Sequence, residues 1–184
     1  MKDQKVSQLM IPLSDYATVN ADDTLGHAIQ ALKDAQTDTR FVHKHRAVLV
    51  YDENCHVVGK LGIREILKAL EPKYMQFAHP ENEDTVHLSR FGFSADFLNS
   101  LVDRLGLWND SIDELVGHAV SQKVEDVMYT PSNGEFVDLD APVAEAVHQF
   151  ILGCHQSLLV QDGTKVVGIL RLSDLFDLVC EISQ

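Results

Sequence analysis

The amino-acid sequence contains two copies of one pattern, and this internal repeat limits the possible folds more than any other feature. Four blocks recur in the same order, namely residues 6–10 (VSQLM) and 124–128 (VEDVM), 22–32 and 140–150, 47–50 and 157–160, and 57–67 (VVGKLGIREIL) and 166–176 (VVGILRLSDLF). A repeated chain builds one structural unit per copy. Because a unit of about sixty residues buries only a small core by itself, we expect the two units to pack on each other.

Each copy has the apolar pattern of a strand, a helix, two strands and a second helix, in that order. Apolar residues spaced i, i+3, i+4 and i+7 predict the first helix of each copy, and they are Leu25, Ala28, Ile29 and Leu32, and Val143, Ala146, Val147 and Phe150. Asp22 and Asp140 are the predicted N-caps, and Pro142 is expected in the first helical turn. The remaining elements are predicted as strands at residues 47–51, 57–61, 158–160 and 166–170, and as helices at residues 63–70 and 172–182.

Residues 71–122 resemble neither copy and form an insert between them. We expect an acidic loop at residues 77–85, followed by a helix that begins at Ser94 and ends at Gly106. Its apolar stripe is predicted to serve packing rather than a cofactor pocket, and the stripe comprises Phe97, Leu98, Leu101, Val102 and Leu105. Ser111 is expected to cap a further helix, which carries Ile112, Leu115 and Val116. The predicted domains are residues 1–70, 71–122 and 123–184.

Charge and cysteine usage exclude several classes of protein. The chain has 15 basic and 28 acidic residues and a formal charge of −13, which disfavours nucleic acid and anionic membranes as partners. No stretch approaches the roughly 18 apolar residues of a membrane span, and no signal peptide is evident. Three widely spaced cysteines predict reduced, mostly packed thiols, and they are Cys55, Cys154 and Cys180. We therefore expect a soluble, cytoplasmic protein.

No arrangement of residues predicts a metal site or a catalytic site. His43 and His45 would share one face of a strand, but two ligands alone do not make a zinc site. The adjacent Cys154 and His155 do not indicate a catalytic pair, because such pairs are positioned by the fold. No set of nucleophile, base and orienting group can be named. We expect no enzyme activity, no metal and no required cofactor.

The repeated openings VSQLM and VEDVM and the closing blocks VVGKLGIREIL and VVGILRLSDLF resemble a tandem pair of CBS domains, the arrangement called a Bateman module. The resemblance covers residues 6–70 and 123–184. It implies an α/β (α+β) fold in which two βαββα repeats pack with pseudo-twofold symmetry, with a mostly helical insert between them. It also implies a homodimer that acts as a regulatory sensor and binds adenine nucleotides or related adenosyl ligands in clefts between the repeats.

The family's closing motif supplies the candidate ligand residues. In this motif a Ser or Thr precedes by three residues an Asp that accepts both ribose hydroxyls. Asp174 matches that Asp, whereas Arg171 stands at the Ser/Thr position and favours a phosphorylated ligand, since it can bind phosphate bidentately. The resemblance assigns further residues to this nucleotide cleft, namely Ile169 as the adenine wall, with Asp23, Ala28, His45, Arg46 and His155, and Gln156 nearby.

The first copy departs further from the motif and predicts a weaker or empty second cleft. Its residues are Glu65, Gly62, Lys60 and Ala146, and the longer Glu side chain loses more rotamer entropy than Asp on binding. Two simpler interpretations remain open: Asp174 as a helix-start carboxylate and Arg171 as a solvated or ion-paired side chain. The alternative function is a dimerising scaffold with degenerate ligand sites that binds a protein partner through the insert. The sequence does not choose between AMP, ADP and ATP.

Overall fold

The computed structural model describes residues 4–39, 44–71, 73, 99–100, 102–104, 106–107 and 109–183. The predicted order of elements is confirmed in both copies. The first repeat consists of β2 (Thr18–Asn20), α1 (Leu25–Thr37), β3 (Ala47–Tyr51), β4 (Val57–Gly62) and α2 (Ile63–Leu70). The second consists of β5 (Phe136–Asp138), α7 (Val143–Gly153), β6 (Ser157–Asp162), β7 (Lys165–Arg171) and α8 (Leu172–Ile182).

Each repeat forms one sheet from its three strands. In the first sheet β2 is parallel to β3, and β3 is antiparallel to β4. The second repeat has the same order and directions in β5, β6 and β7. The irregularity in register also recurs, since it follows Val50 in β3 and Val160 in β6. The copies are therefore equivalent strand by strand, and the fold is the predicted α+β arrangement of two repeats.

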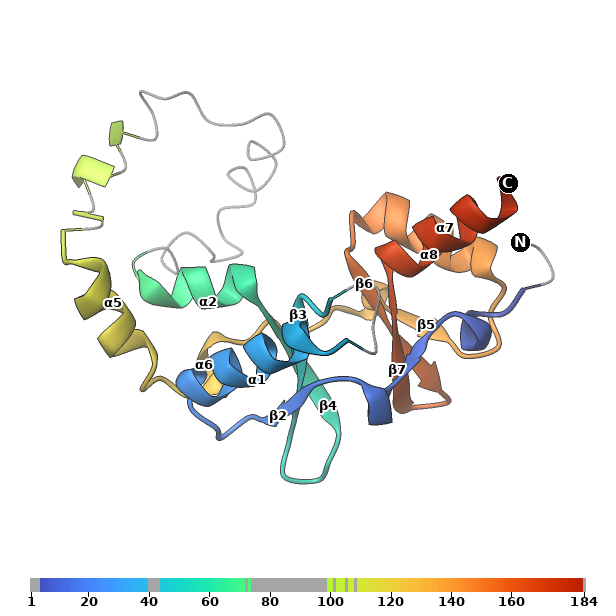
Figure 1. Ribbon diagram of the computed structural model, residues 1–184, viewed down its shortest axis with the longest axis horizontal. Helices are drawn as coiled ribbons and strands as arrows, with labels where there is room; N and C mark the ends of the chain where they lie inside the picture. The colour runs from blue at the N-terminus through green and yellow to red at the C-terminus, as the bar shows by residue number, and fades with distance from the viewer. Residues whose placement is uncertain are drawn as a thin grey trace.

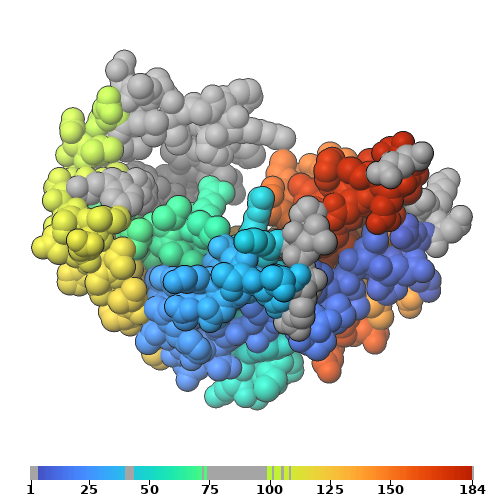
Figure 2. Space-filling model, in the orientation of Figure 1, coloured from blue at the N-terminus to red at the C-terminus, as the bar shows by residue number. Residues whose placement is uncertain are grey.

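The segment that precedes each repeat packs on the other repeat. Val6 lies in a short 3-10 turn, and its N–H donates to the Ala141 carbonyl at 3.0 Å. Val124 begins α6 (Val124–Val127), and its N–H donates to the Asp23 carbonyl at 2.9 Å. Both valine side chains are fully buried. In Figures 1 and 2 the dark blue start of the chain accordingly lies against the red and orange C-terminal repeat.

Two glycines at equivalent positions make room for these crossing segments. The short strand β1 (Ile11–Pro12) pairs with β7, and a Cβ atom on Gly168 would lie 2.7 Å from the carbonyl oxygen of Ile11. A Cβ atom on Gly59 in β4 would collide with the sulfur of Met128. A glycine inside a strand often marks such a close approach of another backbone. The glycine in both VVG sequences is therefore explained by packing between the repeats.

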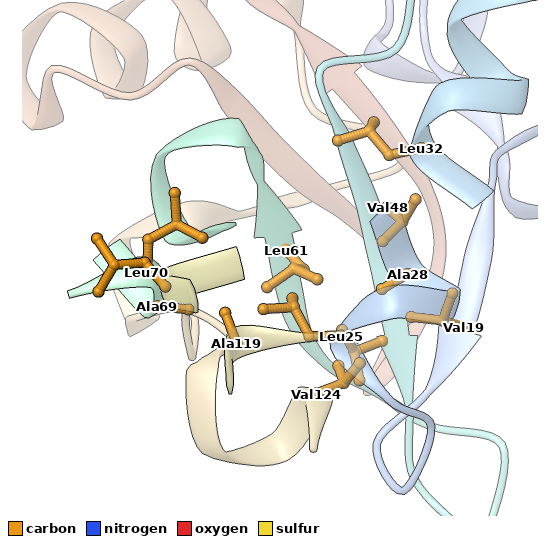
Figure 3. Packing of buried hydrophobic residues seen from close by; sticks show 12 residues of the cluster. Val19, Leu25, Ala28, Leu32, Val48, Leu61, Ala69, Leu70, Ala119 and Val124 are labelled. Atoms are coloured by element: carbon orange, nitrogen blue, oxygen red, sulfur yellow. The ribbon is translucent and has the colours of Figure 1, made fainter. Parts of the chain in front are cut away.

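Three groups of buried apolar side chains hold the molecule together. In the first core, Leu25 and Ala28 of α1 pack near Leu61 of the sheet, and α5 (Ile112–Ala119) of the insert adds Ala119 (Figure 3). A matching second core lies under α7 and α8. The third group, which we call the seam, joins the two sheets and consists of Ile11, Tyr16, Leu49, Leu159 and Ile169. Because the seam draws on both repeats, their predicted packing on each other is confirmed.

The starts of two helices differ from the prediction. Thr24 rather than Asp22 caps α1, and its Oγ1 accepts a backbone N–H of the first turn at 3.3 Å. The N-cap of α7 is Pro142, which lies just before the first turn, and Asp140 instead pairs with Lys5 at 2.7 Å. An N-cap side chain reaches the free N–H groups only from the position directly before the helix, and both aspartates lie too early.

The described part of the insert contains one confirmed helix start. The Ser111 Oγ accepts the Glu114 N–H at 3.4 Å, and the Glu114 carboxylate accepts the Ser111 N–H at 3.0 Å. Val102 of the predicted stripe is exposed. Gly106, the predicted helix end, has a positive φ of 57°, and of the apolar residues predicted for the next helix Leu115 is buried whereas Ile112 and Val116 are exposed. Several predicted features of the insert lie outside the described residues, namely the acidic loop at residues 77–85, the helix start at Ser94, and Phe97, Leu98, Leu101 and Leu105.

The cysteines are less buried than predicted. Cys55 and Cys154 are exposed, so the expectation of packed thiols is wrong for both. Their backbones take positive φ angles of 60° and 53°. These residues lie in the turn before β4 and directly after α7, where the chain reverses direction at the surface. Cys180 is half-buried.

Candidate functional site

Residues of both closing blocks, 57–67 and 166–176, lie in the seam or pack against it. Leu159 and Ile169 lie opposite each other in β6 and β7, and both side chains belong to the seam. Because side chains alternate along a strand, Arg171 faces the same side as Ile169. Lys60 in β4 occupies the position equivalent to Ile169, opposite Leu49. The two repeats therefore carry different side chains at equivalent strand positions, a lysine in the first repeat and an isoleucine in the second.

Arg171 and Asp174 form a close ion pair at the start of α8. The Asp174 carboxylate accepts the Arg171 backbone N–H at 2.9 Å, and the Arg171 Nε lies 3.0 Å from both carboxylate oxygens. The Arg171 Nη2 donates to Oδ1 as well. The two side chains are only 13% and 11% exposed. Asp174 thus caps α8, as the simpler interpretation predicts, and it also binds the guanidinium with both oxygens.

An aromatic pair from the first repeat lies on this side of the seam. The rings of Tyr16 and His45 stack with their centroids 4.1 Å apart and an interplanar angle of 12°, and both are buried. Burial raises the pKa of Tyr16 to about 12, while the Arg171 guanidinium lowers this pKa and the Asp174 carboxylate raises it. The Tyr16 hydroxyl therefore stays protonated at neutral pH, and it lies within electrostatic range of the ion pair.

A hollow of about 290 Å³ opens beside the aromatic pair. This volume is near the lower end of the range for small-molecule sites. Its lining comprises Ser14, Asp15, Tyr16, Ala17, Ala31, Asp34, Ala35, Asp38 and His45. Three of these side chains are carboxylates, so the hollow suits a neutral or cationic group better than a phosphate. Arg171 and Asp174 lie outside this lining.

The equivalent position in the first repeat keeps the helix cap and lacks the arginine. Glu65 accepts the backbone N–H of Gly62 at 3.2 Å, as Asp174 does from Arg171. A Cβ atom on Gly62 would lie 3.1 Å from the Glu65 carboxylate and 3.3 Å from the Arg46 carbonyl oxygen. The start of α2 is therefore tightly packed without any side chain at residue 62.

A shielded ion pair between Lys60 and Glu135 lies on the side of the seam where α2 begins. The Lys60 Nζ lies 2.6 Å from the Glu135 Oε2, and their side chains are only 12% and 3% exposed. The Tyr129 hydroxyl and the Ser132 N–H donate to the other Glu135 oxygen, and the Lys60 Nζ also lies 3.5 Å from the Ser157 Oγ. Burial by itself raises the pKa of Glu135, but these donors outweigh it and hold the pKa below its usual value.

The seam therefore has two ends, which we name by their acids. The Asp174 end consists of Arg171, Asp174, Tyr16 and His45. The Glu135 end consists of Lys60, Glu135, Tyr129 and Glu65. Of the residues predicted for the first cleft, the structure brings Asp174, Arg171, Ile169 and His45 to the Asp174 end, and of those predicted for the second it brings Lys60, Gly62 and Glu65 to the Glu135 end.

Other predicted site residues lie away from the seam. Ala28 and Ala146 have no exposed surface and pack inside the first and second cores, which corrects their predicted place in the clefts. The apolar face of each helix points at its own sheet, so these methyl groups cannot reach a ligand. Asp23 accepts the Asn20 N–H at 2.7 Å, and its carbonyl binds Val124, which holds it in the turn before α1.

The residues that directly precede β3 and β6 do not lie together in one site. Arg46 is exposed, and its carbonyl oxygen lies beside Gly62 rather than beside Asp174. The His155 ring lies close to Gly134, one residue before Glu135. The Gln156 carbonyl accepts the backbone N–H that begins α8 at 3.0 Å. Of this group, only Gln156 is tied by a described contact to the start of α8.

Three residues at the two ends of the seam were not predicted from the sequence, namely Tyr16, Tyr129 and Glu135. One signal for the ion pair was present in the repeat itself. Glu135 stands where the first copy has Ala17, and Lys60 stands where the second copy has Ile169. A positive charge in β4 and a negative charge directly before β5, each where the other copy has an apolar residue, indicate an ion pair across the seam. No comparable pattern marks the tyrosines.

Within the described ranges, the structure offers neither a metal site nor a membrane span. No three His, Cys, Asp or Glu side chains in these ranges converge on one point. His43, one of the two histidines weighed as metal ligands, lies outside the described residues. None of the described helices combines the length and apolar character that crossing a bilayer requires.

Comparisons with known proteins place this fold. A search of curated proteins finds no match. The structure is similar to a CBS domain-containing protein of unknown function from Bacillus anthracis, with TM-score 0.63, 17% identity, and 98% of this chain and 95% of that chain covered. It is similar to the CBS domain of a membrane protein from Sphaerobacter thermophilus, with TM-score 0.61, 19% identity, and 96% and 88% covered. It is also similar to CBSX2 in complex with AMP, with TM-score 0.59, 16% identity, and 98% of both chains covered.

The sequence gives the same answer independently of the structure. The family model of the CBS domain matches residues 6–72 and 124–181, which together make up more than half of the chain. These two stretches contain the two structural repeats. The chain therefore belongs to the CBS-domain family and carries two CBS domains in tandem.

Proposed function

We propose that this CBS-domain pair is a regulatory module that binds one adenine nucleotide per chain, such as AMP, ADP or ATP, at the Asp174 end of the seam. The observation that carries the proposal is the contrast between the two ends. The Asp174 end has a capping acid, an arginine and an aromatic pair beside a hollow. At the Glu135 end, the protein's own lysine and glutamate occupy the seam. The AMP complex of the similar CBSX2 structure supports this ligand class.

Each part of a nucleotide has a suitable group at the Asp174 end. The Asp174 carboxylate accepts hydrogen bonds from the ribose hydroxyls. The Tyr16–His45 stack, which lines the hollow, provides aromatic surface for adenine, whereas Ile169, the predicted adenine wall, is buried in the seam behind it. The Arg171 guanidinium pairs with the phosphate, since a planar fork of donors matches phosphate oxygens. The carboxylates of the hollow keep the phosphate away from α1 and direct it to Arg171.

Such a ligand regulates by touching both repeats at once. Asp174 belongs to the second repeat, whereas Tyr16 lies in the chain that leads into the first. A ligand that contacts both favours the relative orientation for which its affinity is higher. This mode of action requires no bond to be formed or broken. The change in orientation is the signal that a regulated partner would read.

Calorimetric titration of the wild-type chain, D174A and E65A with AMP, ADP and ATP tests the proposal. We expect one ligand per wild-type chain. D174A is expected to weaken binding roughly 10- to 100-fold, because a hydrogen bond to a charged group contributes about 1.5–3 kcal/mol. E65A is the matched control, since it also removes a capping carboxylate, and it should leave the affinity unchanged. No binding of any of the three nucleotides, or an equal loss in both variants, contradicts the proposal.

A second proposal, the homodimer, rests on an exposed apolar stripe. Leu172, Phe176 and Val179 of α8 are 42%, 64% and 49% exposed. In α2 the equivalent residues Ile63 and Leu67 are exposed as well, and both helices lie on the upper side of the molecule in Figure 1. We propose that a second copy of the chain covers this face, because equivalent stripes on the two repeats can meet across a twofold axis.

Sedimentation measurements test the homodimer. The wild-type chain is expected at twice its mass of 20.5 kDa, and F176D is expected to shift it to the monomer. I151D is the control, because Ile151 is equally exposed on α7 but lies outside the stripe. A wild-type monomer at high concentration, or dissociation by I151D alone, contradicts this proposal. A dimer without nucleotide binding would instead favour the interaction scaffold as the function of the chain.

A further inference from the structure

The apolar stripe of α2 has basic side chains along one margin. Ile63 and Leu67 are 47% and 54% exposed, and Arg64 and Lys68 each follow directly after one of them. Consecutive residues of a helix are turned by about 100° relative to each other, so both cations lie on the same side of the stripe. The only acid of the helix, Glu65, caps its start. α2 therefore presents an apolar stripe with a basic margin.

The equivalent stripe of α8 has an acidic margin. Asp177 occupies the position equivalent to Lys68 and follows the exposed Phe176. Glu181 is exposed and comes four residues later, on the same side of the helix. The helix itself contains no lysine or arginine between Leu172 and Ile182. The two stripes are thus alike in apolar character and opposite in charge.

We propose that in the homodimer the α2 stripe of each copy packs on the α8 stripe of the other copy, and that neither stripe packs on its own counterpart. It rests on the proposed homodimer and assigns the two surfaces that meet. A single twofold axis makes both contacts, because a contact from α2 to α8 on one side is repeated from α8 to α2 on the other. We call this arrangement the crossed pairing.

The charges favour the crossed pairing over the pairing of like stripes. When like stripes meet, Arg64 and Lys68 face their own copies, and so do Asp177 and Glu181. Facing like charges disfavour association, whereas complementary margins favour it. The net charge of −13 makes two copies repel each other overall. A basic margin that faces an acidic one therefore offsets part of this repulsion at both contacts.

The crossed pairing also brings the insert of one copy to the ligand end of the other. The insert follows α2 directly, and its helix α5 packs on α2. The Gln122 side-chain amide, just after α5, donates to the Ala69 carbonyl at 3.1 Å. Asp174 lies in the first turn of α8, two residues after Leu172 of the stripe. A change at the Asp174 end thus reaches the insert of the second copy across the interface.

Sedimentation equilibrium of full-length charge-reversal variants tests the pairing. The variants are R64E/K68E on α2, D177K/E181K on α8, and the combination of all four changes. We expect each pair of reversals to raise the dissociation constant of the dimer roughly tenfold, because an attractive contact becomes a repulsive one. The combined variant is expected to return close to the wild-type value, since its margins are again complementary.

The matched control is K33E/K165E, at two exposed lysines outside both stripes. It adds as much negative charge as R64E/K68E but should have a much smaller effect on the dimer. If neither pair of reversals weakens the dimer, or if the combined variant is no tighter than either pair, the crossed pairing is wrong and the homodimer stands. A wild-type monomer at high concentration overturns both. All of these results leave the proposed nucleotide site unaffected.

Carbodiimide cross-linking of the wild type provides a second test that needs no variant. The reagent joins a lysine amine to a neighbouring carboxylate without a spacer, and a mixture of unlabelled and isotope-labelled chains distinguishes links between copies from links within one. We expect linked peptides that join Lys68 of one copy to Asp177 or Glu181 of the other. If the reversal variants do not fold, this measurement is the test, and a dimer that yields no link between α2 and α8 of different copies contradicts the crossed pairing.

Discussion

The two ends of the seam show how one repeated fold can produce two different sites. At the Asp174 end, the ion pair lies within one helix turn, and the second repeat alone supplies both of its members. At the Glu135 end, the ion pair joins β4 of the first repeat to the residue before β5 of the second. The first pair can open without separating the repeats. The second pair holds the repeats together, so that end of the seam is a structural contact.

The difference depends on very few residues. The strand order, the register and the helix caps are the same at both ends. Lys60 replaces the apolar Ile169, and Glu135 replaces the small Ala17. With these two changes the chain places its own pair of charges at one end of the seam. A duplicated fold therefore need not keep two equivalent surroundings at its two ends, and comparing its copies position by position shows where they differ.

The largest expected effect is the loss of one partner at the Glu135 end. E135A leaves the Lys60 ammonium shielded and without its carboxylate, and we expect it to lower the free energy of unfolding by about 3–5 kcal/mol. Denaturant unfolding measures this change. E125A is the matched control, because the Lys123–Glu125 pair is exposed, and it should cost about 1 kcal/mol at most.

The double variant K60I/E135A sharpens the same comparison. It places an apolar residue on β4, as in β7, and a small residue before β5. Replacing a buried ion pair by apolar residues is often neutral or stabilising. We therefore expect the double variant to regain most of the stability that E135A loses. A double variant as unstable as E135A would show that the ion pair is not the cause.

A smaller effect is expected from the two glycines that face the crossing segments. A Cβ atom on Gly168 meets the backbone oxygen of Ile11 at 2.7 Å, whereas a Cβ atom on Gly59 mainly meets the flexible side chain of Met128. G168A should therefore lower stability by about 1–3 kcal/mol, and G59A by less, because a methionine side chain can move and a paired strand cannot. Unfolding curves of the two variants provide the test, and equal losses would contradict this account of the crossing.

The smallest expected effect is a pH dependence confined to the Glu135 end. The pKa of Glu135 is lower in the folded protein than its ordinary value of 4.5. A carboxyl of this kind stabilises the fold above its unfolded pKa, and that stabilisation is lost as the pH falls through the folded pKa. The advantage in melting temperature of the wild type over K60I/E135A should therefore shrink as the pH is lowered below 4.5. An advantage that grows on acidification would reverse the assigned sign.

The sequence predicts the fold because local signals and the repeat agree. The spacing of Leu25, Ala28 and Leu32 gives the face of α1 that packs on the sheet, and the same pattern recurs in α7. The exchange of Val6 and Val124 between the cores was not predicted, since periodicity describes faces within one element and says nothing about which neighbour covers them. The caps at Asp22 and Asp140 were misplaced because helix ends depend on the position of the first turn.

The site was predicted less completely than the fold. Asp174 and Arg171 were found through the closing motif, and their mutual ion pair follows from their positions, since Arg171 is the N-cap of α8 and Asp174 lies three residues later in its first turn. Ala28 and Ala146 were assigned by resemblance alone, and their burial rules out a contact with ligand. Tyr16 reaches the seam through tertiary packing, with no pattern in the sequence around it. Contacts between distant segments are the part that a single sequence does not contain.

The most direct test of the account is an NMR titration of the isotope-labelled protein with AMP. The account predicts that backbone amide signals at Arg171, Asp174 and Tyr16 shift with a single binding curve. It predicts that the signals of Gly62, Glu65 and Glu135 remain in place at the same ligand concentration. Shifts at the Glu135 end that match or exceed those at the Asp174 end would contradict the claim that only one end of the seam is a ligand site.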